Sequence, residues 1–198
     1  MSGKRPSMKV LVVYAHPNPE SFNAAILHQT EESLIEAGHD VHVLDLYKEG
    51  FEASMSLEER ERYMTRDNTD GIEQDIGRLR WAEALVFIYP TWWMGPPAIL
   101  KGWLDRIWLP GIVATFENGK VKPGLTKIKK ILVITTQGAA RWRMAAVGNP
   151  PRKMFRLSLK QVTNSVKADW MALYSMDKVT EEKRVGFLKK VQKRVMKL

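Results

Sequence analysis

The sequence predicts an α/β protein in which helices cover both faces of a doubly wound, five-stranded parallel sheet. Short runs rich in β-branched residues alternate with segments of helical periodicity, which is the pattern of consecutive βαβ units. Several of the runs are continuously apolar, as expected for strands buried on both faces. With 198 residues, 44% hydrophobic and 27% charged, the chain is long enough to bury a proper core. We therefore expect residues 1–198 to form one domain, with residues 1–7 flexible.

Five segments have the composition of strands of this sheet. Each is short and apolar, and turn-forming residues or a helical pattern follow it. The expected strands are residues 10–14 (VLVVY), 41–46 (VHVLDL), 84–89 (ALVFIY), 131–135 (ILVIT) and 169–175 (DWMALYS). A small additional β hairpin is expected at Asn118 and Gly119, because Asn-Gly strongly favours a tight hairpin turn.

The helices carry their own start and stop signals. Ser21 is placed to cap the first helix, and Gly38 supplies its stop. Ser56 and Glu59 have the spacing of a capping box, within an excursion that follows the second strand. The proline pair 96–97 suits the first turn of a helix, where missing N–H groups cost little. The longer helices expected are residues 21–37, 70–82, 96–108 and 180–197. The side chains of the last helix expected to face inward are Val185, Leu188, Val191 and Val195.

Residues 89–108 (YPTWWMGPPAILKGWLDRIW) contain four tryptophans that divide into two pairs. Trp103 and Trp108 follow the helical period, so we expect both to pack in the core. Trp92 and Trp93 come directly after a strand that ends at a proline, where a ligand crevice is expected. Flat aromatic surface in that place suits a planar heteroaromatic ring.

Ligands of open α/β sheets bind outside the carboxyl ends of the strands, near the point where strand order reverses. The segments at that edge are residues 15–23 (AHPNPESFN), 90–97 (PTWWMGPP) and 136–144 (TQGAARWRM). The first ends at a helix N-terminus with Ser21 and Asn23, which favours phosphate binding. Neither GxGxxG nor a P-loop is present, so a Rossmann dehydrogenase or an ATPase is not supported.

Composition excludes several classes of site and leaves others open. The chain has no cysteine, which excludes a disulfide scaffold, a cysteine nucleophile and thiolate metal sites. Its four histidines lack the spacing of metal ligands backed by carboxylates, so no metal site is expected. They are His16, His28, His39 and His42. His16 could be a ligand-binding residue or a turn residue held by the backbone, and Ser21 could be a helix cap alone.

The net charge of +9 admits three explanations: solvated faces, attraction of phosphate-bearing ligands, or nucleic acid. Because no nucleic-acid-binding motif accompanies the basic segments, we expect no nucleic-acid partner. No apolar run approaches the roughly 20 residues that span a bilayer. The N-terminus, MSGKRPSMK, lacks the features of a signal peptide. We therefore expect a cytoplasmic protein without membrane insertion.

Three motifs in order resemble the NAD(P)H quinone oxidoreductase family of flavodoxin-like proteins. They are AHPNPESFNAAI at 15–26, FIYPTWWMGPPAILKGWLDRIWLPGIVATFENGK at 87–120 and ILVITTQGA at 131–139. That family includes bacterial modulator-of-drug-activity quinone reductases and ancillary subunits of glutathione-gated potassium efflux systems. The resemblance covers about residues 8–140. It implies a flavodoxin-like sheet with strand order 2-1-3-4-5.

The resemblance also implies a tightly held flavin, for which we expect FAD, with FMN as the alternative. The residues implied at its phosphate and ribityl end are His16, Ser21, Phe22, Asn23 and Ala25. Those implied along the isoalloxazine are Pro90, Thr91, Trp92, Trp93, Met94 and Gly95. Those implied at its pyrimidine edge are Thr135, Thr136, Gln137 and Gly138. In such enzymes NAD(P)H passes hydride to the flavin and leaves, and a quinone then takes its place. Family members are usually homodimers with the pocket shared across the interface.

The sequence departs from the family pattern directly after Thr136. The better-known quinone reductases have a Thr-Gly-Gly turn followed by a Tyr and a His that assist hydride transfer. Here the turn is TTQG, AARWRM follows, and no histidine occurs after His42. The candidate catalytic residues are therefore Arg141 and Arg143, either of which could stabilise negative charge at the flavin N1–C2 edge. A solvated or phosphate-facing role is the alternative for both.

Three functions follow from the resemblance and the charge. The first is a flavoenzyme that uses NAD(P)H to reduce quinones or similar two-electron acceptors. The second is a flavin-binding regulatory subunit of a potassium efflux transporter. The third, a flavodoxin-type electron carrier, is disfavoured because such carriers are generally acidic and this chain is basic.

Overall fold

The computed structural model describes residues 6–164 and 166–198, and its main sheet has five parallel strands. In spatial order they are β2 (Asp40–Asp45), β1 (Lys9–Tyr14), β3 (Ala84–Thr91), β6 (Lys130–Gln137) and β7 (Ala168–Leu173). Counted along the chain within this sheet, the order is 2-1-3-4-5. The predicted fold class and strand order are confirmed.

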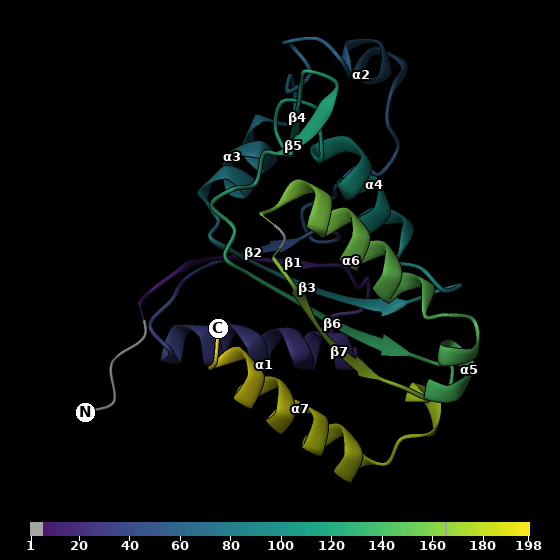
Figure 1. Cartoon of the computed structure of the whole chain (residues 1–198). Helices are drawn as coiled ribbons and strands as arrows, with labels where there is room; N and C mark the ends of the chain where they lie inside the picture. Colours follow the sequence, from purple (N-terminus) through teal and green to yellow (C-terminus); the bar gives the residue numbers. More distant parts are fainter. Residues whose placement is uncertain (1–5, 165) are drawn as a thin grey trace.

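Helices lie on both faces of the sheet (Figure 1). One face is covered by α1 (Phe22–Glu36) and α7 (Glu181–Val195), and the other by α3 (Glu73–Trp81), α4 (Ala98–Ile107) and α6 (Pro150–Val162). Side chains of a strand alternate between two cores: Val10 and Val12 face α1 and α7, whereas Leu11 and Val13 face the other three helices. Burial on both sides explains why the strands are continuously apolar.

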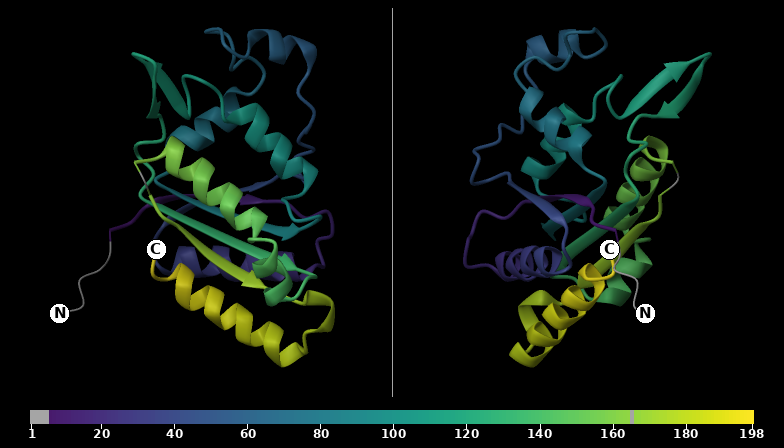
Figure 2. Two further views of the ribbon diagram at one scale, coloured as in Figure 1. Left: turned by 45° about the vertical axis from the view of Figure 1, so that its right-hand side comes forward. Right: turned by 90° about the vertical axis from the view of Figure 1, so that its left-hand side faces the viewer.

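Four smaller elements complete the described chain. They are α2 (Leu57–Arg62), the hairpin of β4 (Ala114–Glu117) and β5 (Lys120–Pro123), α5 (Arg141–Ala146) and the 3₁₀ turn η1 (Met176–Lys178). Figure 2 shows the hairpin extending away from the sheet. Asn118 and Gly119 form its turn with φ of 52° and 71°, as predicted. The Ser56–Glu59 capping box at α2 is also confirmed.

The predicted helix signals are confirmed at α1, whereas α4 begins two residues later than predicted. Ser21 caps α1 by accepting the Ala24 N–H at 3.2 Å, and Gly38 follows the helix with a φ of 83°. At α4, Pro97 occupies the N-cap, so the prolines precede the first turn instead of lying in it.

The second tryptophan pair packs as predicted. Trp103 is fully buried and meets Phe87 edge-on, with ring centroids 6.4 Å apart. Trp108 is partly buried against the same core. This pair therefore joins α4 to the sheet.

Strands β3 and β6 run two residues further than predicted, so Pro90, Thr91, Thr136 and Gln137 belong to strands and not to loops. A proline is tolerated here because the β1–β3 ladder ends at Ile88, before Pro90 is reached. The longer strands carry predicted site residues out to the edge of the sheet.

The prediction that Val185 faces inward is wrong, since its side chain is 42% exposed. The buried stripe of α7 instead runs through Phe187, Val191 and Val195, each four residues from the next, with Leu188 partly buried. Helices α5 and α6 were not predicted, although Phe155 and Leu159 of α6 are buried at a helical spacing of four residues.

The expectation of flexibility for residues 1–7 falls mostly on residues 1–5, which lie outside the described part. Ser7 Oγ donates to the Gly38 carbonyl at 2.7 Å. Within the described residues, no helix combines the length and the apolar character needed to cross a bilayer.

Candidate functional site

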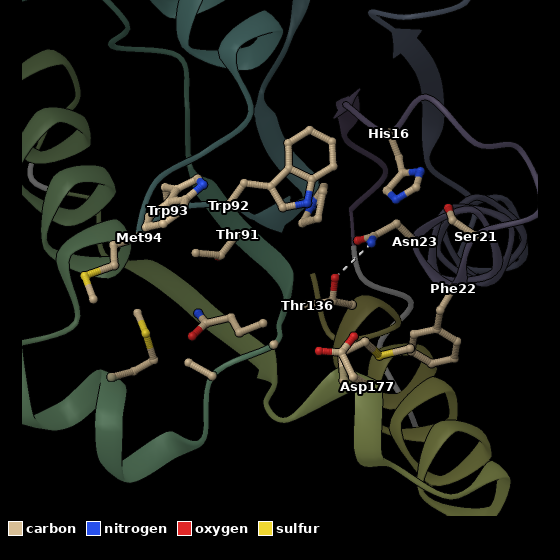
Figure 3. Close-up of a pocket in the computed structure, with 16 residues that line it drawn as sticks. His16, Ser21, Phe22, Asn23, Thr91, Trp92, Trp93, Met94, Thr136 and Asp177 are labelled. Atoms are coloured by element: carbon tan, nitrogen blue, oxygen red, sulfur yellow. Dashed lines mark hydrogen bonds between the residues drawn. The ribbon is translucent and has the colours of Figure 1, made fainter.

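A pocket of about 850 Å³ lies at the carboxyl ends of the central strands, where the α/β fold places ligands (Figure 3). It is bordered by the β1–α1 loop, the turn after β3, the end of β6 and η1. The predicted cofactor-binding residues that line it are His16, Ser21, Phe22, Asn23, Pro90, Thr91, Trp92, Trp93, Met94, Thr136, Gln137 and Gly138. The structure thus brings together residues from all three motifs.

Five predicted residues do not line the pocket: Ala25, Gly95, Thr135, Arg141 and Arg143. Gly95 closes the turn after β3, and Thr135 is buried with its hydroxyl 2.8 Å from that of Thr91. Both arginines are exposed on α5, and the Arg143 guanidinium lies 5.2 Å from the centre of the neighbouring Trp142 ring. The buried residue of α5 is Met144, which lines the pocket in their place.

Four further residues line the pocket: Ala139 and Met144, which lie in the predicted 136–144 segment but were not singled out, and Met176 and Asp177, which were not predicted. Met176 and Asp177 belong to η1, directly after β7, and the Ser175 N–H donates to the Ala139 carbonyl at 3.1 Å. The carboxyl end of the fifth strand obeys the same rule as the others, so this signal was available in the sequence.

In the β1–α1 loop, Ser21 and His16 each have a structural role and also lie at the pocket. Ser21 is a helix cap that also borders the pocket, and His16 is held by the backbone while lining the same pocket. His16 Nδ1 lies 3.0 Å from the Asn18 amide nitrogen and 3.2 Å from the Asn18 carbonyl oxygen, so it accepts from the first or donates to the second according to the tautomer. Burial lowers the pKa of His16, and the Asn18 carbonyl opposes that shift.

The turn after β3 displays aromatic surface on a strained backbone. Trp92 and Gly95 exchange two backbone hydrogen bonds of 3.0 Å, which makes a two-residue hairpin turn. Its central residues, Trp93 and Met94, have φ of 47° and 62°, so both are left-handed, as in a type I′ turn. Trp93 is fully exposed and Trp92 is 44% exposed. Large side chains in such a turn indicate a function other than folding.

The polar groups of the pocket are only partly paired among themselves. Asn23 Nδ2 donates to Thr136 Oγ1 at 2.9 Å, joining α1 to β6 (Figure 3), but Asn23 Oδ1 is buried without a partner. Gln137 is buried, and neither atom of its carboxamide has a partner within the described structure. Unpaired buried groups beside a flat, aromatic-bordered pocket and a helix N-terminus fit a planar, phosphate-bearing cofactor such as a flavin.

Metal binding finds no support in the part of the chain that the structure describes. No three His, Asp or Glu side chains there come close enough together to hold an ion. Asp177 is the acidic side chain in the pocket lining.

The chain matches the flavodoxin-like fold family over residues 8–197 and belongs to that family. It is 37% identical over 133 residues to an uncharacterized NAD(P)H oxidoreductase of Haemophilus influenzae, covering 67% of this chain and 65% of that protein. It is 33% identical over 161 residues to ribosyldihydronicotinamide dehydrogenase [quinone] of Mus musculus, covering 71% and 66%.

The same fold and a similar extent are seen in a solved structure. The NAD(P)H:quinone oxidoreductase from Methanothermobacter marburgensis has a TM-score of 0.81 at 28% identity, covering 96% of this chain and 98% of that one. The aligned regions span between 45% and 66% of the length of the first curated relatives.

Proposed function

We propose that this protein is an NAD(P)H-dependent flavoprotein oxidoreductase that reduces quinones or similar two-electron acceptors. The observation that carries the proposal is the pocket at the strand ends, where an exposed aromatic turn, a helix N-terminus and unpaired buried polar groups meet. Relatives named as NAD(P)H and quinone oxidoreductases support it.

The phosphate end of the flavin would lie at the N-terminus of α1. The free N–H groups and the dipole of that helix favour an anion, and Ser21 and Asn23 supply polar side chains beside it. His16 Nε2 is not part of the Asn18 contacts, and in the tautomer that carries its proton, or in the charged ring, it would donate to the phosphate. The bound flavin would supply the ring that accepts hydride from NAD(P)H and passes it on.

The ring would lie between the aromatic turn and the end of β6. Trp92, Trp93 and Met94 offer a flat apolar border, and Gly138 lets the chain pass close to the ring. The pocket is near the upper end of the usual range of about 300–1,000 Å³ for small-molecule sites. We expect nicotinamide and acceptor to occupy the remaining space in turn, which gives ping-pong kinetics.

The exposed positions of Arg141 and Arg143 make their catalytic role a separate proposal. Neither side chain lines the pocket. Replacing each with Met and following flavin reduction by NAD(P)H tests this role. Unchanged reduction rates in both variants would remove it.

We also propose a cytoplasmic homodimer, with residues 1–198 as one domain. The exposed Trp93, Met94 and Trp142 support a second protomer covering this side of the pocket. Sedimentation of the purified protein tests the oligomeric state.

The visible spectrum of the purified protein tests the central proposal, followed by chromatography of the released cofactor. We expect flavin absorption, FAD in preference to FMN, and oxidation of NAD(P)H that depends on added quinone. A protein that stays colourless after soaking with both flavins would overturn the proposal.

A further inference from the structure

The positive charge of the chain is concentrated in one stretch of sequence. Residues 118–168 contain 12 of the 31 lysines and arginines and none of the 22 acidic residues. The rest of the chain carries 19 basic and 22 acidic residues, so the net charge of +9 comes entirely from this stretch. Such an asymmetry is typical of chains that contact nucleic acid or a membrane surface.

Helix α6 presents part of this charge to solvent as a basic row formed by Arg152, Arg156 and Lys160. The three side chains are exposed and follow each other at a spacing of four residues, so they lie along one side of the helix. Within the described residues none of them has an ion pair. By contrast, Lys129 of the same stretch is paired with Glu83. The basic row is therefore left without a counter-charge in the described protein.

The basic row is unfavourable for the helix that carries it. Like charges four residues apart repel each other, and cations in the first turn oppose the helix dipole. Arg152 and Lys153 lie in that turn, which has no acidic residue, and the N-cap Asn149 makes no capping hydrogen bond. Helix α7 is also basic, but its first turn holds two acidic residues and its last turn two basic ones, as the dipole favours. The charges of α7 thus suit its own stability, whereas those of α6 do not.

Three kinds of partner can neutralise the basic row, and the structure favours an anionic lipid surface. A second copy of this chain is disfavoured, because an isologous contact through this face would bring the same positive charges together. Nucleic acid would meet the basic side chains, but Leu157, which is 55% exposed beside them, gains nothing from phosphate groups. A bilayer surface suits both, because its headgroups attract basic side chains and an apolar side chain can enter the region between them.

We propose that the outer face of α6 attaches the protein to an anionic membrane surface, with the basic row on the lipid phosphates and Leu157 among the headgroups. The apolar side chains Phe155 and Leu159 are buried against the sheet, so the helix lies on the membrane and does not enter it. Figure 2 shows α6 on the face of the sheet opposite α7. The attachment needs no flavin, and it would hold the protein at the surface in which hydrophobic quinones dissolve.

Vesicle sedimentation tests the attachment. The full-length protein is mixed with vesicles of phosphatidylcholine alone, or of phosphatidylcholine with about 30% phosphatidylserine, and the bound fraction is measured. The variant R152Q/R156Q/K160Q removes the basic row. It should be at least as stable as the native protein in urea, because it relieves repulsion between like charges. If it does not fold, R156E alone should still weaken binding.

We expect the native protein to bind the vesicles that contain phosphatidylserine, more weakly as the salt concentration rises, and not the neutral ones. A basic side chain near an anionic surface strengthens binding by about fivefold, so loss of the basic row should weaken it by about tenfold or more. The matched control K183Q/K189Q/K190Q removes the same charge from exposed positions of α7 and should weaken it by less than about threefold. L157Q should also weaken binding, although it leaves the charge unchanged.

Three results would overturn the proposal. The first is a native protein that does not bind the vesicles containing phosphatidylserine. The second is binding to a DNA duplex but not to these vesicles at the same salt concentration, which would assign the basic row to nucleic acid. The third is an equal loss in the two triple variants, which would show that net charge alone attracts the protein. Vesicle binding by protein freed of flavin supports the attachment even if the proposed function fails.

Discussion

Arg106 and Gln137 are both largely buried polar side chains, but their surroundings differ. The Arg106 guanidinium bonds to the Glu59 carboxylate, with Nε–Oε1 at 2.9 Å, and to the Glu52 carbonyl, and it lies 5.1 Å from the centre of the Phe51 ring. The Gln137 carboxamide has no partner in the described structure. The polar contacts of Arg106 are made within the protein. They attach the segment of residues 47–68 to α4. The Gln137 side chain has no such contacts among the described residues.

The backbone shows the same contrast. At Gly102 in α4, an added Cβ would lie 2.3 Å from the carbonyl oxygen of Ala53, so the close approach of the excursion requires glycine. At Trp93 and Met94, a turn that favours glycine or asparagine carries two large side chains. Residue choice follows the fold in the first region and the proposed ligand in the second.

Substituting Gly102 should have the largest effect on stability. We expect G102A to lower the free energy of unfolding by about 2 kcal/mol or more, because its methyl group meets the Ala53 backbone, which cannot move independently. The matched control is G77A in α3, where nothing lies within 4 Å of the added Cβ. That change should raise stability by about 0.5–1 kcal/mol, as alanine does within helices. Urea unfolding of both variants checks this, and equal effects would contradict it.

Removing the Arg106 charge should have the next largest effect. Burial raises the pKa of Glu59, but the Arg106 hydrogen bond and the Ser56 N–H outweigh it, so the net pKa is lowered. Because the pair is only partly exposed, R106M should lower the free energy of unfolding by about 1–2 kcal/mol at pH 7. K101M, which breaks an exposed pair with Asp105 on the same helix, should change it by less than about 0.5 kcal/mol.

The pH dependence gives a second check on Arg106. The contribution of a carboxylate with a lowered pKa is present above its unfolded value of about 4.3 and is lost as the pH falls through the folded value. The deficit of R106M relative to the native protein should therefore shrink in acid. A deficit that is constant between pH 7 and pH 3 would show that lost packing on Phe51, and not the ion pair, causes it.

The two regions also differ in how far the sequence predicts them. Periodicity and turn residues located the strands, and the position of Trp92 after a strand end located the pocket. The partnership of Arg106 with Glu59 joins residues 47 positions apart and has no local signal. The exposure of Arg141 depends on how a short helix is rotated, which composition alone does not determine. Asp177 was predictable in principle, because it follows the fifth strand at the same edge of the sheet.

Exchanging the residues of the two type I′ turns should change the free energy of unfolding by less than the Arg106 substitution does. The change should have opposite signs at the two turns. W93N/M94G gives the turn after β3 the residues found at Asn118–Gly119, and should raise the free energy of unfolding by about 1 kcal/mol by relieving left-handed strain. The reverse exchange in the β4–β5 hairpin should lower it by a similar amount. Urea unfolding measures both. If W93N/M94G is destabilising, the Trp93 and Met94 side chains contribute to the fold and the contrast between the regions weakens.

The smallest expected effect on the free energy of unfolding comes from the protonation of His16. Burial keeps its pKa below the ordinary value of 6.5. Without flavin, its contribution to stability is present above the unfolded pKa and is lost as the pH falls through the folded pKa. We expect that loss to stay below about 0.5 kcal/mol, because the ring is only partly buried. NMR titration of the imidazole Cε1–H signal measures the pKa directly.

Binding of FMN should reverse the sign of this dependence. A phosphate beside His16 Nε2 favours the charged ring, so its pKa should rise above 6.5. Its contribution would then be present below the unfolded pKa and be lost as the pH rises through the folded pKa. His39 is the control, since burial also lowers its pKa, but its Nδ1 accepts from Met8 N–H at 3.1 Å and it does not line the pocket. A shift at His16 alone locates the phosphate at the N-terminus of α1, whereas equal shifts at both histidines would reflect a general change in the protein's field.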